Sequence, residues 1–297
     1  MSLLEQVTTG KQIGAQVHVI TGHNGIGKTT FAASFPGPLI IDLEKGSEHL
    51  DVPRIPSNNI PTFKKLRDLL KDLASTKHEY KTVTIDSVES IETLINQAVC
   101  EEGKVKSIED FGYGRGYVLA RDLMKDLFSD FRALQDKGIS TILTAHTQVK
   151  SQTDPANNQT YDRIIMRAND KLASVVRDLA DNVLYATHKV FTTEVKNKTQ
   201  AFSSGQRVLL TQWRAGHDAK NRLDLPYEIP LSFDAFKEAC EKKSDTKAEE
   251  LVQSIEEMSS GFDEKLKASV KEQVAKHKTN PEKLREISNR LMKYANA

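Results

Sequence analysis

The feature that most constrains this chain is a glycine-rich octapeptide that directly follows a β-branched run. Residues 22–29 read G-H-N-G-I-G-K-T, which fits the pattern G-x-x-x-x-G-K-T, and residues 17–21 before them read V-H-V-I-T. A strand, a glycine-rich turn and a helix in this order bring backbone N–H groups around phosphate oxygens at the positive end of the helix. The sequence therefore predicts a site for a nucleoside triphosphate on an α/β scaffold.

The positions of this loop have distinct expected roles. Lys28 is expected to reach the β- and γ-phosphates and to act in catalysis, and the Thr29 hydroxyl is expected to ligate Mg²⁺, which prefers oxygen ligands. ATP and Mg²⁺ are thus the expected cofactors. The other residues expected to contact the nucleotide are Gly22, His23, Asn24, Gly25, Ile26, Gly27 and Thr30.

Size, charge and cysteine usage narrow the class of protein. At 297 residues the chain can form one large α/β domain with a small appendage. Cys100 and Cys240 are too few and too far apart for a metal site, and no apolar run is long enough to span a bilayer, so we expect a cytoplasmic protein without a membrane partner. The formal net charge of +1 provides no global attraction to nucleic acid.

Short apolar runs alternate with amphipathic helices along the first half of the chain. The runs at residues 17–21, 39–42, 83–86 and 139–145 are typical of buried parallel strands. The clearest helix carries apolar residues on one stripe and ends before Gly138, a residue suited to a left-handed turn. The stripe consists of Leu119, Leu123, Leu127, Phe131 and Leu134.

The second half of the chain has a different pattern. Residues 182–190 and 207–213 are predicted to form strands that extend the sheet in an antiparallel manner, with a hairpin tip at 196–206. The almost purely polar residues 241–250 then predict a charged linker between a core at 1–240 and a helical tail at 251–297. Basic residues outnumber acidic ones in the tail, which is typical either of a second binding surface or of a solvated helix face.

A carboxylate for the metal ion is expected at the end of the strand at 83–86. Asp86 would hold Mg²⁺ through a water molecule at the edge where α/β sheets place ligands. The alternative is an N-cap for the helix that follows.

The carboxylate that activates the attacking water cannot be the residue directly after Asp86, because that residue is Ser87. Glu44 is the candidate catalytic base, which would accept a proton from the water or orient it, since it ends the apolar run at 39–44, a strand expected to lie beside the phosphate loop. Asp42 and Glu89 compete for this role, and an ordinary exposed acid is the alternative for Glu44.

The strand at 139–145 is followed by two polar side chains, His146 and Gln148. Either could donate a hydrogen bond to the γ-phosphate and lose it on hydrolysis, which would move the segment that follows. Two ordinary surface residues are the alternative.

With these motifs in this order, the chain resembles a RecA-type core over residues 14–236. Lys220 and Arg222 resemble the Lys-x-Arg element that RecA-type helicases and recombinases donate to a neighbouring subunit. The chain is similar to phage-encoded RecA-like P-loop ATPases, an AAA-type group of phage nucleotide-binding proteins that includes single-strand annealing recombinases.

The resemblance implies a RecA-like P-loop NTPase core in residues 1–240, with a mostly parallel central sheet and a small helical C-terminal region. It also implies a homo-oligomer, either filament or ring, whose ATP sites are shared, with Lys220 and Arg222 as catalytic groups supplied in trans. A solvated charge pair is the alternative for these two residues. For a phage protein, the expected compartment is the cytoplasm of the bacterial host.

RecA-like proteins bind single strands through loops after the sensor strand, and residues 150–171 form a long polar stretch at that place. Cations next to an aromatic ring suit a single-stranded DNA groove, although acidic neighbours leave a simple exposed loop as the alternative. The candidates are Lys150, Tyr161, Arg163, Arg167 and Lys171 in this stretch, and Lys196, Lys198 and Arg207 at the predicted hairpin tip.

The leading hypothesis is a Mg²⁺-dependent ATPase, stimulated by single-stranded DNA, that oligomerises on the strand and promotes annealing or strand exchange in phage recombination. A single-strand-binding protein is a candidate partner. Three alternatives remain: a ring-type DNA helicase, a small-molecule P-loop kinase, and a nucleotide-gated scaffold that does not hydrolyse ATP.

Overall fold

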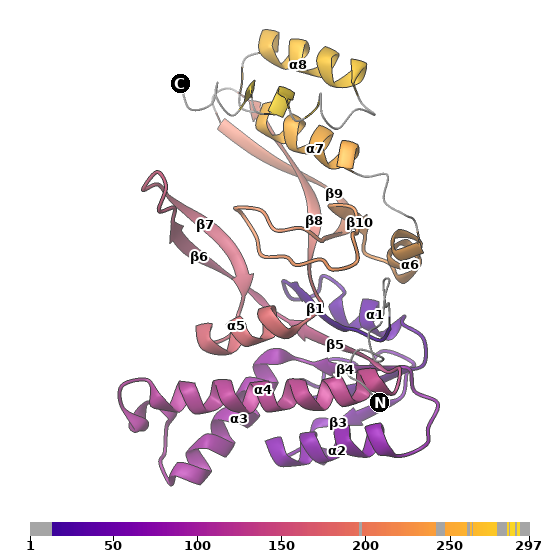
Figure 1. Cartoon of the computed structure of the whole chain (residues 1–297), viewed down its shortest axis with the longest axis vertical. Helices are drawn as coiled ribbons and strands as arrows, with labels where there is room; N and C mark the ends of the chain where they lie inside the picture. The colour runs from indigo at the N-terminus through magenta and orange to yellow at the C-terminus, as the bar shows by residue number, and fades with distance from the viewer. Residues whose placement is uncertain are drawn as a thin grey trace, which may run out of the picture.

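The computed structural model describes residues 14–195, 198–241, 247–259, 262, 264–277, 284, 286–288 and 290–291. One sheet of eight strands runs through the centre of the molecule in the order β10-β9-β8-β1-β5-β4-β2-β3 (Figure 1). The strands are β1 (Val17–Gly22), β2 (Pro38–Asp42), β3 (Arg54–Pro56), β4 (Thr82–Asp86), β5 (Ser140–Ala145), β8 (Asn182–Val195), β9 (Lys198–Leu210) and β10 (Glu228–Pro230).

The neighbouring strands from β8 to β3 in this order are all parallel, whereas β9 runs antiparallel to β8 and β10 antiparallel to β9. The expected α/β core, a mostly parallel sheet with an antiparallel extension, is confirmed. All residues of β1 and β4 are buried, which is why these strands read as continuous runs of Val, Ile and Thr.

Helices cover both faces of the sheet. Helices α1 and α6 cover one face, and helices α2 to α5 cover the other (Figure 1). Alternate residues of β1 divide between them, because Val17 and Val19 belong to the core under α2 to α5, and Ile20 belongs to the core under α1 and α6. The helices are α1 (Lys28–Ala33), α2 (Phe63–Ser75), α3 (Val88–Gly103), α4 (Arg115–Asp136), α5 (Asp170–Leu179) and α6 (Phe233–Glu241), with short 3₁₀ turns at Ser57–Asn59 and Ile108–Phe111.

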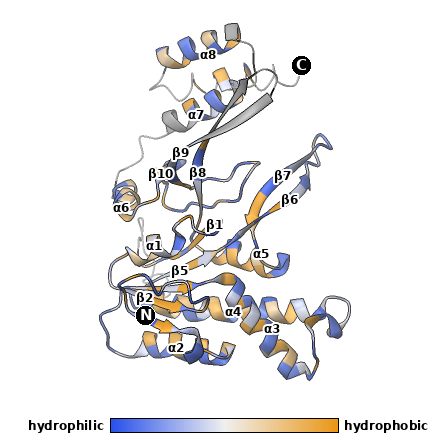
Figure 2. Ribbon diagram, turned by 180° about the vertical axis from the view of Figure 1, so that it is seen from behind, coloured by the Kyte–Doolittle hydropathy of each residue, from blue (hydrophilic) through white to orange (hydrophobic). Residues whose placement is uncertain are grey.

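Hydrophobic residues gather along the central strands, whereas α2, α3 and α4 carry residues of both kinds (Figure 2). The predicted helix that became α4 is confirmed, and Gly138 after it has the left-handed φ of 75° that a glycine adopts readily. One member of its predicted apolar stripe is misplaced: Leu119 is 39% exposed, whereas Leu127 and Phe131 are fully buried.

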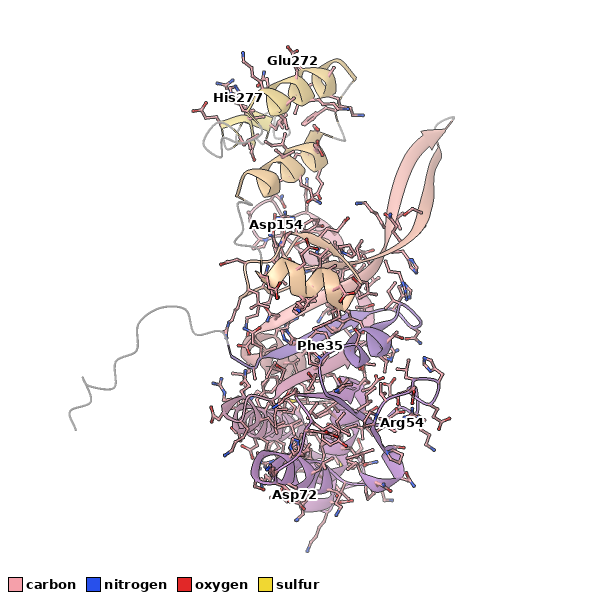
Figure 3. The ribbon with its side chains drawn as sticks, turned by 90° about the vertical axis from the view of Figure 1, so that its right-hand side faces the viewer. Phe35, Arg54, Asp72, Asp154, Glu272 and His277 are labelled. Carbon is pink, nitrogen blue, oxygen red and sulfur yellow. The ribbon has the colours of Figure 1, made fainter. Side chains whose placement is uncertain are left out.

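On the other face, an aromatic group joins α1 to α6. The ring of Phe35, labelled in Figure 3, lies 4.7 Å from that of Phe233 and 5.5 Å from that of Phe236. This contact fixes the start of α6 against the end of α1, and so brings the chain after β10 close to the phosphate loop.

Two predictions about polar segments are wrong. Residues 150–171 are not a long loop, because β6 (Thr147–Thr153) and β7 (Thr160–Met166) form an antiparallel hairpin and α5 begins at Asp170. The predicted hairpin tip at 196–206 is mostly strand, since β9 begins at Lys198. Most of β6 and residues 203–207 of β9 are exposed, so these parts of the sequence lack the apolar alternation that identifies a strand.

The C-terminal segment forms helices with an apolar core of their own. Helices α7 (Lys247–Ser259) and α8 (Glu264–Lys276) bury Ile255, Val270 and Val274 against residues further along the chain. The first of these helices begins inside the predicted linker at 241–250, of which residues 242–246 lie outside the described residues. Within the part of the chain that the structure describes, no helix has the length and apolar character needed to cross a membrane.

Candidate nucleotide site

The phosphate loop joins β1 to α1. Gly25 and Gly27 have φ values of 75° and 107°, a region that other residues rarely adopt, which explains why glycine stands at both positions. A side chain at Gly22 would lie 2.7 Å from the carbonyl oxygen of Ala186, so the loop packs closely against β8. His23, Asn24 and the turn around them remain exposed.

Lys28 points back into this loop. Its Nζ donates hydrogen bonds to the carbonyl oxygens of Gly22 at 2.9 Å and His23 at 3.1 Å, and lies 3.3 Å from His146 Nδ1. Burial lowers the pKa of the ammonium, and the charges of Asp86 and the acids beside it oppose this only in part. A phosphate next to this buried ammonium would stabilise its positive charge.

Thr29 and Asp86 meet at the carboxyl edge of the sheet, as predicted. Thr29 Oγ1 donates to Asp86 Oδ2 at 2.7 Å, and Thr144 Oγ1 on the adjacent strand β5 donates to Asp86 Oδ1 at 2.6 Å. The N-cap residue of α3 is Ser87, so the alternative of a capping role for Asp86 does not apply. A hydroxyl and a carboxylate in contact are a donor set that fits Mg²⁺.

Glu44 reaches the site, but not by the expected route. The sheet order separates β2 from β1 by β5 and β4, so the prediction that this strand lies beside the phosphate loop is wrong. After β2 the chain instead turns across the end of β4, where the N–H groups of Leu43 and Glu44 donate to the Asp86 carbonyl at 2.9 and 3.2 Å. Glu44 Oε1 then accepts a hydrogen bond from Ser87 Oγ, and Oε2 lies 3.2 Å from His146 Nε2.

Asp42, one of the two competing acids, has a structural role. Its carboxylate accepts hydrogen bonds from the N–H groups of Gly46 and Ser47, both at 3.0 Å, and from Ser47 Oγ at 2.6 Å. Burial raises the pKa of Asp42, but these hydrogen bonds outweigh it and the pKa is lowered. Asp42 therefore holds the turn that carries Glu44.

Glu89, the other competitor, lies close to Glu44. Its Oε1 accepts a hydrogen bond from the backbone N–H of His146 at 2.7 Å and lies 3.8 Å from Arg167 Nε. One ligand atom each from Glu44, Glu89 and His146 lies within 4.8 Å of the others. Glu89 thus anchors the end of β5. The side chain of Glu44, by contrast, is 30% exposed, so water can reach its carboxylate.

His146 is the predicted sensor that the structure brings to the site, since its ring bridges Lys28 and Glu44. Gln148 is not brought there. It is exposed on β6, paired with Ile165 of the hairpin.

Lys220 and Arg222 lie at the amino ends of β1 and β8, the sheet edge opposite to the phosphate loop. Lys220 Nζ donates to three carbonyl oxygens at the end of α5, those of Arg177, Asp178 and Ala180, at 2.7 to 2.9 Å. Arg222 Nη1 lies 2.9 Å from Asp181 Oδ1, and Asp181 also accepts from the N–H of Val17, the first residue of β1. Because β1 spans roughly 16 Å, neither cation serves the loop of its own chain.

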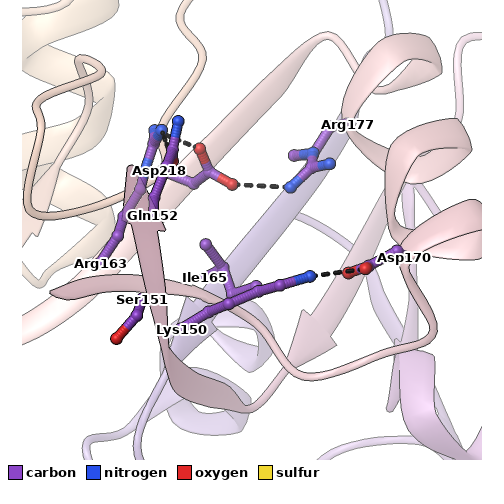
Figure 4. Close-up of a pocket in the computed structure, with 8 residues that line it drawn as sticks. All are labelled: Lys150, Ser151, Gln152, Arg163, Ile165, Asp170, Arg177 and Asp218. Carbon is purple, nitrogen blue, oxygen red and sulfur yellow. Dashed lines mark hydrogen bonds and ion pairs between the residues drawn. The ribbon is translucent and has the colours of Figure 1, made fainter. Parts of the chain in front are cut away.

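The predicted DNA-binding cations of the β6–β7 hairpin are mostly paired with acids (Figure 4). Arg163 is 7% exposed, lies 2.5 Å from Asp218 Oδ1 and stacks on the Trp213 ring at 4.6 Å from its centroid. Arg177 contacts the other oxygen of Asp218 at 2.9 Å, and Lys150 lies 2.5 Å from Asp170. The prediction that Arg163 belongs to an exposed, DNA-facing loop is wrong, because the residue is a buried partner of Asp218.

The remaining predicted DNA contacts are scattered. Tyr161 is half-buried on β7, and Lys171 donates to the Gly114 carbonyl at 3.2 Å. Lys196 lies outside the described residues, and Lys198 is described only as the first residue of β9.

Arg207 is misplaced by the sequence prediction. It is not at a hairpin tip but on β9 beside the phosphate loop, where Nη1 donates to the Ile26 carbonyl at 3.2 Å. No sequence pattern links these two residues, which are far apart along the chain.

The chain matches one family model over most of its length and is similar to proteins of known sequence or structure. A family model described as an AAA domain matches residues 15–223. The SPbeta prophage-derived uncharacterized protein YorG of Bacillus subtilis (strain 168) is 27% identical over 177 residues, which are 59% of this chain and 51% of that protein. The chain thus spans about half the length of this curated relative. Among solved structures, the KaiC-like protein PH0186 of Pyrococcus horikoshii OT3 matches at 15% identity and a TM-score of 0.34, over 73% of this chain and 85% of that one.

The paired cations of the hairpin provide a stability test. Arg163→Ala should lower the free energy of unfolding by about 3 kcal/mol, because it leaves the half-buried Asp218 with one cation fewer. Lys150→Ala removes a cation from an exposed pair on the same hairpin and should cost less than about 1 kcal/mol. Urea denaturation of both variants measures the difference, and equal losses would contradict the structural role of Arg163.

Proposed function

Because the chain belongs to the AAA domain family, we propose that it is a Mg²⁺-dependent ATPase of the RecA type that acts on single-stranded DNA. One observation carries the proposal: side chains from four separate segments meet at the carboxyl edge of the sheet. They are Lys28, Thr29, Glu44, Asp86 and His146.

The phosphates would enter at the start of α1. A γ-phosphate that reaches Lys28 Nζ replaces the two loop carbonyls that now accept its hydrogen bonds. Thr29 and Asp86 would hold Mg²⁺, directly and through a water molecule respectively. When bound, this ion neutralises the charge that develops on the β- and γ-phosphate oxygens.

Glu44 would orient the attacking water. Ser87 Oγ and the His146 ring contact the two carboxylate oxygens of Glu44. These contacts leave few rotamers open to the Glu44 side chain. Its remaining lone pairs can accept a hydrogen bond from water and receive the proton as the water attacks the γ-phosphate.

A RecA-type mechanism is supported by the strand that lies between β1, which leads into the phosphate loop, and β4, which ends at Asp86. This strand, β5, ends at Ala145, and His146 alone separates it from the β6–β7 hairpin, which begins at Thr147. Glu89 and the N–H of Arg167 both bond the backbone of His146, at 2.7 and 2.9 Å. A change at the γ-phosphate would therefore be passed to the base of the hairpin.

The proposal includes ATP sites shared between subunits of a filament or ring. Arg222 suits the contact to a neighbour, because its side chain is 56% exposed and lies on the edge opposite to its own loop. Lys220, bonded to three carbonyls, would instead position the segment that carries Arg222.

The DNA part of the proposal is annealing or strand exchange in phage recombination, with a single-strand-binding protein as candidate partner. The prophage origin of a relative supports the setting. Lys150 and Arg167, with side chains 51% and 52% exposed, are the hairpin cations best placed to contact a phosphate backbone.

The catalytic assignment predicts a separation of binding from turnover. Glu44→Gln should bind ATP as the parent protein does, while the rate of ATP hydrolysis falls by about 100-fold or more, because the amide cannot take the proton. Glu48→Gln changes an exposed acid of the same turn and is the matched control. Rates measured with and without single-stranded DNA should show stimulation of the parent protein. Unchanged turnover in Glu44→Gln would remove this residue from the mechanism, and a rate indifferent to DNA would contradict the DNA-dependent motor.

The shared site predicts complementation between inactive subunits. Mixed Lys28→Ala and Arg222→Ala proteins should regain ATPase activity, since some interfaces then pair an intact loop with an intact arginine. The control replaces the first partner with the Lys28→Ala, Arg222→Ala double variant, which supplies neither group. A mixture as inactive as this control would count against a contribution in trans.

A further inference from the structure

Two carboxylates and an imidazole converge at the carboxyl edge of the sheet. They belong to Glu44, Glu89 and His146, and one ligand atom from each lies within 4.8 Å of the other two. We propose that these residues form a second metal site, suited to a divalent ion of the Zn²⁺ type, and that an ion bound there blocks ATP hydrolysis by occupying the Glu44 carboxylate. The second part of this inference rests on the proposed function.

The spacing of the ligand atoms suits such an ion. Zn²⁺ binds imidazole nitrogen and carboxylate oxygen at about 2.0–2.2 Å in a tetrahedral arrangement, so two of its ligand atoms lie roughly 3.4 Å apart. Glu44 Oε2 and His146 Nε2 are 3.2 Å apart, which is close to this spacing. Glu89 needs at most a small movement of its side chain to complete the set.

Glu89 carries a buried oxygen that makes no hydrogen bond. Its Oε1 accepts from the backbone N–H of His146 at 2.7 Å, whereas Oε2 is buried and has no hydrogen-bond partner among the residues that the structure describes. Burial of a carboxylate oxygen without a partner is unfavourable, and a bound cation removes that cost. This oxygen therefore points to a cation independently of the spacing.

The imidazole distinguishes this site from the Mg²⁺ site. Mg²⁺ prefers oxygen ligands, and Thr29 and Asp86 offer oxygens alone. A ligand set of imidazole nitrogen and carboxylate oxygens suits Zn²⁺ instead. We therefore expect Zn²⁺ to bind Glu44, Glu89 and His146 even when Mg²⁺ is in excess.

The neighbouring cations leave room for this binding. Arg167 Nε lies 3.8 Å from Glu89 Oε1, and Lys28 Nζ lies 3.3 Å from His146 Nδ1, so neither contacts Glu89 Oε2 or His146 Nε2. A metal ion on Nε2 places the ring proton on Nδ1, which ends the hydrogen bond from Lys28. A phosphate that draws Lys28 away from the ring has the same effect, so ATP and the metal ion do not compete.

The consequence for hydrolysis follows from the two oxygens of Glu44. Its Oε1 accepts a hydrogen bond from Ser87 Oγ, and a metal ion would take Oε2. The carboxylate would then be a poor acceptor for the proton of the attacking water. Zn²⁺ should therefore lower the turnover of ATP without preventing its binding.

Zn²⁺ binding to the full-length protein without nucleotide, measured by equilibrium dialysis with Mg²⁺ in excess, tests the site. The parent protein should bind one Zn²⁺ per chain at the highest affinity, and His146→Ala and Glu89→Gln should each lower that affinity by at least tenfold. His49→Ala is the matched control, because it removes an exposed imidazole from the loop that carries Glu44. Equal affinities in the parent protein and both site variants would overturn the inference.

ATP hydrolysis before and after loading with one Zn²⁺ per chain tests the effect on Glu44. The rate of the parent protein and of His49→Ala should fall at least tenfold, while their affinity for ATP stays the same. The rate of Glu89→Gln should not respond to Zn²⁺. An unchanged rate in the Zn²⁺-loaded parent protein would overturn the block on Glu44.

The metal site and the proposed function fail separately. A parent protein that binds Zn²⁺ through His146 but does not bind ATP would overturn the proposed function and leave the metal site in place. A parent protein that hydrolyses ATP but binds Zn²⁺ no better than His146→Ala would overturn the metal site alone. Should His146→Ala unfold, Glu89→Gln decides the matter, because its amide oxygen can still accept from the His146 backbone.

Discussion

The whole site depends on the hydrogen bonds that surround the last residue of β4. The two carboxylate oxygens of Asp86 accept from Thr29 of α1 and Thr144 of β5, and its carbonyl oxygen accepts from the backbone of Leu43 and Glu44. One buried residue thus ties the phosphate-loop helix, the sensor strand and the turn after β2 to the same point. The two hydroxyl donors hold the carboxylate oxygens at the edge of the sheet where a metal ion would bind.

This arrangement explains why the sequence predicts the residues of the site better than it predicts the order of the strands in the sheet. The loop motif at residues 22–29 and the acid at Asp86 are local patterns with a direct physical reading, and the structure brings Thr29 and Asp86 together. The position of Glu44 depends on a turn across β4, held by the buried Asp42, and neither contact leaves a periodic signal in the sequence. The residue was therefore identified correctly as a neighbour of the site while its strand was placed wrongly in the sheet.

Charged residues show the limit of sequence reasoning most clearly. Arg163 and Arg207 are the same type of residue, and each has polar neighbours in the sequence. Arg163 is nevertheless buried against Asp218, whereas Arg207 rests on the phosphate loop. Whether an arginine faces a ligand or an acid is decided by partners far along the chain. The same holds for the β6–β7 hairpin, because most of β6 is exposed and the buried face of β7 includes Arg163, so neither strand shows the apolar alternation that identifies a strand.

The account rests on a triphosphate that takes the place of the loop carbonyls around Lys28. Equilibrium binding of ATP in the presence of Mg²⁺ to the parent protein and to Lys28→Ala tests this most directly. We predict one nucleotide per chain for the parent protein and an affinity at least tenfold lower for the variant, a difference of about 1.4 kcal/mol or more. Equal affinities would contradict the account, because the buried ammonium would then have no part in holding the phosphates.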